Sequence, residues 1–126
     1  MRARLISLVT TLSLLPGAMV LAAARSLLAA VYVASFIVTL LYHASIEQKF
    51  KRLDHVLAYG IIFSNTWMTF HTKVVPCALA GLGCVILALV AYRYARLNPS
   101  RYDAAHGLWH VLSGAAGYAF ASGYAG

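Results

Sequence analysis

The sequence predicts an all-α protein, and more narrowly a polytopic bundle of transmembrane helices. Of the 126 residues, 62% are apolar and only 10% are charged, whereas soluble domains are about a quarter charged. The mean hydropathy is +0.77. The apolar runs are continuous rather than alternating, which favours membrane helices over a β-barrel. This composition excludes an ordinary water-soluble globular domain.

Five apolar stretches reach or approach the roughly 20 residues that a helix needs to cross a bilayer. No internal repeat or low-complexity linker separates them, so residues 1–126 are expected to form a single domain. In chain order the stretches are Leu5–Ala24, Ser26–Ser45, Asp54–Phe70, Val74–Tyr94 and Ala104–Ala125.

The first stretch has two interpretations. It is long enough to be a membrane helix, but Arg2 and Arg4 precede an apolar run that is broken at Pro16 and followed by small residues at 22–24. That order is also typical of a cleaved signal peptide. Cleavage would leave four membrane helices instead of five. Both alternatives place Ser26 on the far side of the membrane, so the orientation of the remaining helices is the same.

The third and fifth stretches are expected to pack inside the bundle. The third is short, and the fifth is rich in glycine and alanine. Gly114, Gly117 and Ala121 would let a neighbouring helix approach the fifth closely, as small residues do in membranes. The two cysteines, Cys77 and Cys84, lie in the fourth stretch and are expected to be packing residues.

The ten Lys and Arg residues predict the orientation of the helices. They lie between the apolar stretches, as loop charges do in membrane proteins, and do not form the basic face of a nucleic-acid binder. Two of them, Arg25 and Lys73, would lie on one side of the membrane and eight on the other. The positive-inside rule therefore places the N-terminus in the cytoplasm and the C-terminus outside. The eight cytoplasmic residues are Arg2, Arg4, Lys49, Lys51, Arg52, Arg93, Arg96 and Arg101.

Four ionisable residues from three predicted helices meet at one membrane depth. His43 ends the second stretch, Asp54 begins the third, and a pair of histidines begins the fifth, all on the cytoplasmic side. Ionisable groups in membrane helices are energetically expensive and mark functional sites. His106 and His110 are four residues apart and share a helix face. Both can therefore bind one Zn²⁺, with His43 as the third ligand of a catalytic zinc site.

The other polar groups near these histidines have predicted supporting roles. Asp54 would hold a water or orient a histidine, and zinc would lower the pKa of that water to near 7 for attack on an amide or ester carbonyl. Thr39, one turn before the first histidine, would bond to the site or to its own backbone. Asn65, about 16 Å deeper than Asp54, would line a channel or form an interhelical hydrogen bond. His55 and His71 do not line up with these ionisable residues and are expected to stay outside the site.

These residues resemble the three signature motifs of the CREST superfamily. Its multi-helix membrane proteins include alkaline ceramidases, the progestin and adipoQ receptors with haemolysin III, GPI-remodelling lipases and myomaker-like proteins. The family pattern is Ser-x-x-x-His, an Asp at the start of the next helix, and His-x-x-x-His on the last core helix. The matching residues here are Thr39-x-x-x-His43, Asp54 and His106-x-x-x-His110. The resemblance implies that the three histidines bind zinc and that Asp54 is the aspartate of the family, while the branch stays open.

The chain departs from this pattern in two ways. Thr39 stands where the family usually has Ser, and its extra methyl group would crowd the site. The family core has seven helices, three of them between the Asp helix and the last His helix, whereas here only Val74–Tyr94 lies between them. Losing two helices still returns His106 to the side of His43, so the metal site would survive. The lipid pocket would be lost unless a second copy of the chain, in a homo-oligomer, completed it.

The sequence therefore predicts an integral membrane, zinc-dependent hydrolase of lipid amide or ester bonds, with membrane lipids and not nucleic acid as its partners. Two alternatives stay open. A receptor-like or structural membrane protein would retain the zinc site without catalysis. A haem-b protein would use two of the histidines as axial ligands.

Overall fold

The computed structural model describes residues 2–45 and 48–125, and within these ranges the protein is all-helical, as predicted. The first helix is continuous and consists of α1 (Arg2–Thr11), the 3₁₀ segment η1 (Leu12–Leu14) and α2 (Leu15–Ala23). Four more helices follow in the described ranges, with a second 3₁₀ turn, η2 (Pro99–Arg101), before the last. They are α3 (Leu28–Ser45), α4 (Gln48–Phe70), α5 (Val75–Leu97) and α6 (Tyr102–Ala125).

Pro16 explains the 3₁₀ segment between α1 and α2. Proline has no N–H, so the carbonyl of Leu12 cannot receive the α-helical hydrogen bond from residue 16. That carbonyl accepts the N–H of Leu15 instead, three residues on, which is the hydrogen bond of a 3₁₀ helix. The chain therefore stays helical through the proline.

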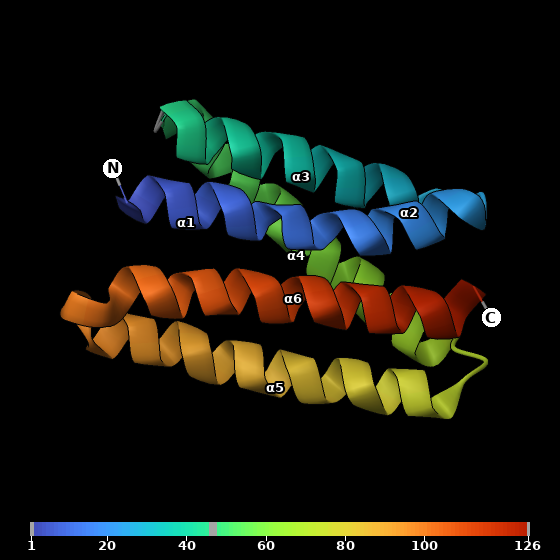
Figure 1. Ribbon diagram of the computed structural model, residues 1–126. Coiled ribbons are helices and arrows are strands. Elements are labelled where there is room, and N and C mark those ends of the chain that lie inside the picture. The colour runs from blue at the N-terminus through green and yellow to red at the C-terminus, as the bar shows by residue number, and fades with distance from the viewer. Residues whose placement is uncertain (1, 46–47, 126) are drawn as a thin grey trace.

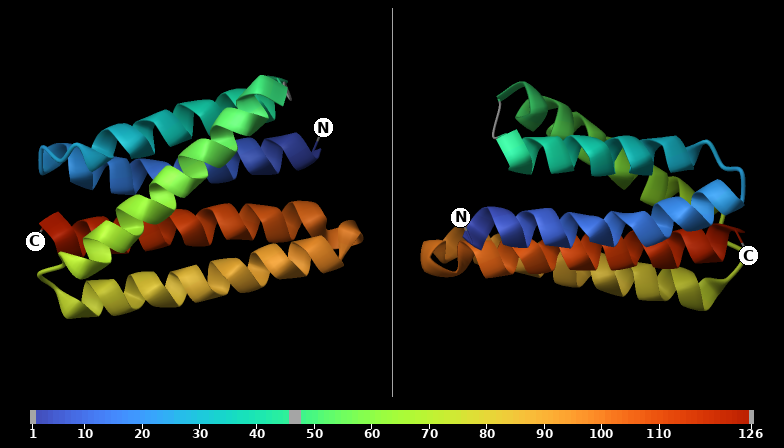
Figure 2. Two further views of the ribbon diagram at one scale, coloured as in Figure 1. Left: turned by 180° about the vertical axis from the view of Figure 1, so that it is seen from behind. Right: turned by 45° about the horizontal axis from the view of Figure 1, so that its top comes forward.

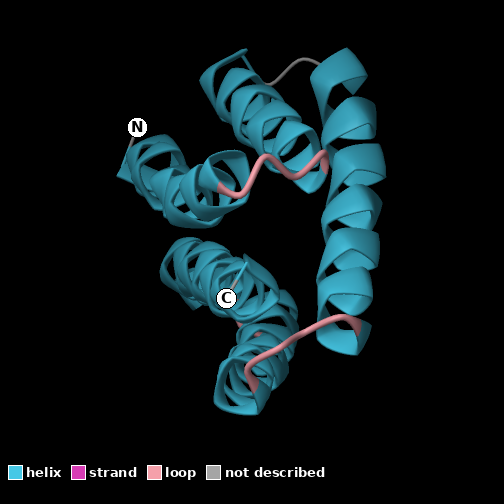
Figure 3. Cartoon of the chain, turned by 90° about the vertical axis from the view of Figure 1, so that its right-hand side faces the viewer, coloured by secondary structure: helices cyan, strands magenta, loops and turns pink. Residues whose placement is uncertain are grey.

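Four of the helices form a curved layer, and α4 crosses it. In Figure 1 the layer runs from α3 through the first helix and α6 to α5. Figure 2 shows α4 running diagonally from the end of α3 toward the start of α5, and Figure 3 shows it standing to one side of the other helices. α6 lies at the centre because it packs against α1, α2, α4 and α5.

Two expectations about the third helix are wrong. It is not short, because α4 begins at Gln48 rather than at Asp54. Residues 48–53 are mostly good helix formers without glycine or proline, so the helix starts before the apolar stretch and Asp54 lies in its second turn. Nor does α4 pack inside the bundle, since Ser64 and Met68 are the buried residues among those described in this helix.

The small residues of α6 do allow close packing, as predicted. A Cβ atom on Gly114 would overlap the carbonyl oxygen of Ser13, and a Cβ atom on Gly17 would lie 3.3 Å from the backbone of Gly117. Ala121 is completely buried. The first helix and α6 therefore meet with their backbones almost in contact.

The hydrophobic core joins α2, α3, α4 and α6. Its largest members are Leu21, Tyr32, Met68 and Phe120, each at most 2% exposed. Cys84 packs against this cluster as a free, half-buried thiol, as expected of a packing residue.

Among the described residues, two helices are long and apolar enough to cross a membrane, Leu28–Ser45 and Val75–Leu97. The apolar part of the first helix, Leu8–Ala23, is shorter. The first two turns of α4 carry several charges, and α6 contains histidine, serine and many glycines, so both are less apolar.

Candidate metal centre

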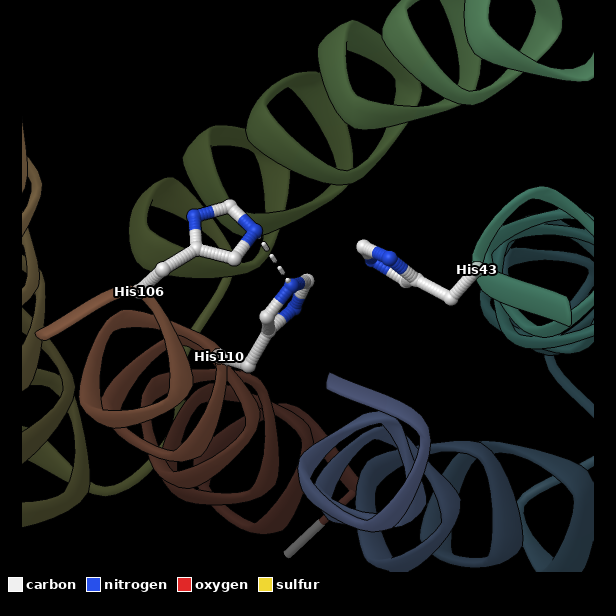
Figure 4. A group of neighbouring side chains, drawn as sticks. All are labelled: His43, His106 and His110. Atoms are coloured by element: carbon white, nitrogen blue, oxygen red, sulfur yellow. Dashed lines mark hydrogen bonds between the residues drawn. The ribbon is translucent and has the colours of Figure 1, made fainter. Parts of the chain in front are cut away.

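The three histidines predicted to bind a metal lie close together with their rings turned toward one another, as Figure 4 shows. His43 comes from the last turn of α3, and His106 and His110 come from successive turns near the start of α6. One ring nitrogen of each histidine lies within 4.8 Å of those of the other two. The ring centroid of His43 is 6.0 Å from that of His106 and 5.5 Å from that of His110.

This spacing fits a single metal ion. Two nitrogens bound at about 2.0–2.1 Å to one tetrahedral ion are roughly 3.3 Å apart, and the Nε2 atoms of His106 and His110 are 3.2 Å apart. All three histidines are partly buried. The donor set could therefore hold a zinc ion and leave its fourth position for water or substrate.

Thr39 and Asp54 form a hydrogen-bonded pair beside the histidines. The Thr39 hydroxyl donates to Oδ1 of Asp54. Of the two predicted alternatives, it therefore bonds to the site rather than to its own backbone. The Thr39 side chain is 5% exposed, which shields this bond from water. The Asp54 carboxylate also interacts electrostatically with His43 and His106.

A cavity of about 270 Å³ begins beside His110 and extends under α4. It forms between α3, α4, α5 and α6, where α4 diverges from α5 as it crosses the layer. Thr39 and Asp54 also line this cavity, so it adjoins the candidate metal centre directly. Most of the remaining wall is apolar.

Asn65 has both of the roles predicted for it. It lines the cavity and also accepts a hydrogen bond from the hydroxyl of Tyr32. Tyr32 is completely buried, so its hydroxyl needs this partner. The pairing could not be predicted, because the sequence does not show which residue of α3 faces Asn65.

His55 and His71 lie outside the cluster, as expected. Each Nδ1–H donates to a backbone carbonyl four residues earlier in α4, at 2.7 Å to Lys51 and 2.9 Å to Trp67. The ring of His71 also stacks on Trp67, with centroids 4.0 Å apart.

Aromatic rings pack against the candidate metal ligands, a role that was not predicted for them. Tyr102 stacks on His106, with centroids 5.1 Å apart and planes at 13°. The ring centroid of Trp109 lies 5.2 Å from that of His106 and 4.9 Å from that of His110. The ring centroid of Tyr92, on α5, lies 5.6 Å from that of Trp109. Tyr102 stands four residues before His106 and Trp109 three after it, so helical spacing could have revealed both contacts.

Tyr102 precedes the apolar stretch of its helix and has several ionisable neighbours. Burial raises the pKa of its phenol. The hydroxyls of Tyr42 and Tyr92 raise this pKa further, as does the carboxylate of Asp103. The guanidinium of Arg96 lowers it. The ionisable groups that act on Tyr102 therefore come from α3, α5 and α6.

Ser13 of η1 also contacts one of the candidate ligands. Its hydroxyl donates to the main-chain carbonyl of His110 at 2.8 Å, across 97 positions of sequence. No local pattern marks this contact, because it depends on how closely the first helix approaches α6. The bond attaches the first helix to α6 at His110, a candidate metal ligand.

Within the described residues, the fold and the cluster define an all-helical protein with two candidate membrane-crossing helices and three histidines placed to hold a metal. No protein-family model, curated protein or solved structure matches this chain. A function is therefore inferred from the geometry and the motifs.

Proposed function

We propose that this chain is an integral membrane protein of the CREST type that binds one Zn²⁺ and hydrolyses an amide or ester bond of a lipid. The observation that carries the proposal is the convergence of His43, His106 and His110, with ring nitrogens within 4.8 Å. The Thr39–Asp54 pair and an apolar cavity adjoin this cluster. A metal, an acidic group and space for a lipid tail are the parts that such a hydrolase needs.

The apolar surface supports a membrane location. On α5, Leu79 and Ile86 are each 63% exposed and Val90 is 61% exposed, an unfavourable arrangement in water but a favourable one against lipid tails. We propose that the five helices cross the membrane, with α4 and α6 enclosing the polar site. The start of α1, the end of α3, the start of α4 and the α5–α6 turn lie at one end of the molecule (Figure 1), and the three histidines come from the last turn of α3 and the first turns of α6. The positive charges at this end assign it to the cytoplasm.

The chemistry divides between the metal and the protein. His43, His106 and His110 would hold a zinc ion, which would supply a water of pKa near 7 and polarise a carbonyl. Asp54 receives the Thr39 hydrogen bond on one oxygen and has a second oxygen that can accept the proton of the water. The water oxygen would add to the carbonyl carbon, the C–N or C–O bond would break, and Asp54 would return its proton to the departing amine or alcohol.

The cavity accounts for a lipid substrate. An apolar cavity of ~150 Å³ holds one benzene molecule, so about 270 Å³ corresponds to roughly ten carbon atoms on the same scale. Leu14, Ile61 and Val85 provide apolar wall beyond the polar end. An acyl chain lying there would place its carbonyl beside His110.

Metal analysis of the purified protein tests the proposal. We expect near one zinc per chain in the wild type and roughly tenfold less in His110→Ala, because two imidazoles alone hold zinc weakly. His55→Ala is the matched control and should retain its zinc, since that ring bonds to its own helix. A wild type without zinc would refute the hydrolase.

Lipid assays separate the alternatives. Hydrolysis of a ceramide, a phospholipid or a GPI-type lipid, lost in His110→Ala, supports the enzyme. Zinc retained without any hydrolysis would assign the chain to the receptor-like or structural class. A Soret band in the absorption spectrum would instead assign the histidines to haem.

A further inference from the structure

Arg96, in the last turn of α5, is held in position by Tyr92. Its Nη1 donates to the Tyr92 hydroxyl at 3.1 Å, and its guanidinium carbon lies 5.8 Å from the centroid of that ring. No carboxylate in the described part of the chain forms an ion pair with Arg96. A guanidinium has five N–H donors, so most of them remain available to an anion.

The position of Arg96 connects it with the metal centre. Tyr92, which holds Arg96, lies against Trp109, and Trp109 contacts both His106 and His110. Tyr92 and Trp109 also line the cavity. A series of side-chain contacts therefore links the guanidinium to the candidate metal site and to the wall of the cavity.

Arg96 lies near phenols, each a potential hydrogen-bond donor, and these phenols also lie near one carboxylate. The phenols of Tyr42 and Tyr92 interact electrostatically with that of Tyr102. Each phenol can donate a hydrogen bond. The carboxylate of Asp103 also interacts electrostatically with the phenol of Tyr102. Hydroxyl and guanidinium donors together are the groups that bind phosphate, which arginine grips with two parallel hydrogen bonds.

We propose that Arg96 binds the phosphodiester of a lipid headgroup and thereby directs the metal centre to phospholipids rather than to lipids without phosphate. This assignment rests on the proposed lipid hydrolase and specifies its substrate. In a glycerophospholipid the ester carbonyls are only a few bonds from the phosphate. A phosphate on Arg96 would leave one carbonyl near the histidines and its acyl chain in the cavity.

Trp109 can report this binding directly. The chain has two tryptophans, and Trp67→Phe would leave Trp109 as the sole fluorophore at the site. The protein in uncharged detergent is titrated with dihexanoyl phosphatidylcholine, dihexanoylglycerol, glycerophosphocholine and inorganic phosphate. These four probes separate the lipid tails from the phosphate.

We expect the phosphatidylcholine to bind more tightly than each of the other three probes. Arg96→Gln should weaken its binding about tenfold, since a charge-assisted hydrogen bond is lost. Arg96→Lys, which keeps the charge but not the two-pronged geometry, should lose less. Arg93→Gln is the matched control on the same helix and should bind normally. Affinity for dihexanoylglycerol should be the same in all of these proteins.

Three outcomes would overturn the proposal. They are an equal loss in Arg93→Gln, no preference of the wild type for phosphatidylcholine over dihexanoylglycerol, and inorganic phosphate binding as tightly as the phospholipid. Zinc content and hydrolysis are measured on the same samples. Zinc and hydrolysis without an effect of Arg96 would refute this proposal alone. Arg96-dependent phospholipid binding in a protein that holds no zinc would refute the hydrolase alone.

Discussion

α6 packs in opposite ways on two adjacent sides. On the side of the first helix and α3, Gly107, Gly114 and Gly117 leave no room for another atom, and we call these three residues the glycine seam. On the side of α4, Trp109, His110, Ser113 and Ala116 line a cavity of about 270 Å³. One helix therefore has a closed side and an open side.

The two sides of α6 have different roles. The glycine seam brings Ser13 close enough to bond the carbonyl of His110, so the closed side holds a candidate ligand in place. The open side leaves space next to the same histidine for a substrate. Sites of this kind need a rigid scaffold on one side and access on the other.

The largest effect is expected where an atom is added to the glycine seam. Gly114→Ala should lower the free energy of unfolding by about 3 kcal/mol, because the new Cβ overlaps main-chain and side-chain atoms of Ser13 and the backbones must separate. Gly83→Ala, where no atom lies within 4 Å, should instead raise it by about 0.5–1 kcal/mol. Thermal unfolding in detergent measures both. Equal stability of the two variants would mean that the seam is not closed.

The next effect concerns the polar end of the cavity. Thr39→Val keeps the shape but removes the donor to Asp54, and should reduce lipid hydrolysis about 10- to 100-fold while zinc is retained. Thr39→Ser keeps the hydroxyl and should restore most of the activity. Parallel activity and metal measurements separate a positioning role from a structural one. Full activity in Thr39→Val would show that the hydrogen bond does not matter.

A smaller effect is expected at the far part of the cavity. Tyr32→Phe removes the hydrogen bond to Asn65 and should lower the free energy of unfolding by about 1 kcal/mol. Tyr118→Phe changes a tyrosine that is 50% exposed, and should have no measurable effect. If both variants unfold alike, the buried bond contributes nothing.

The smallest effect on stability is expected from filling the cavity. Ser113→Leu adds atoms one residue before Gly114 in sequence but on the open side, so stability should change by less than about 1 kcal/mol. Lipid binding should fall, because the added side chain occupies space intended for the acyl chain. A loss of stability as large as that of Gly114→Ala would abolish the contrast between the two sides.

The helices could be predicted well, and the layout only in part. Four of the five apolar stretches begin and end within a few residues of the observed helices, because hydropathy acts locally. The start of α4 could not be found in this way, since its first turns are charged rather than apolar. Its diagonal course, which creates the cavity, is a matter of how it packs on α3 and α6.

The candidate site shows the same limits. Helical spacing placed His106 and His110 on one face, and the alternation of helix directions brought His43 to the same end. Neither argument could reveal that Ser13 bonds to His110 or that Tyr92 holds Arg96. Their contacts depend on distances between helices, and those are set by side-chain volumes along whole interfaces.

The sequence by itself determined that the chain is all-helical and that two imidazoles lie one turn apart, because both follow from the 3.6-residue period of the α-helix. Only the tertiary structure decided that His43 completes the group within 4.8 Å and that a cavity adjoins it. The physical reason is that backbone hydrogen bonds form between neighbours in sequence, whereas the approach of two helices is decided by every residue packed between them.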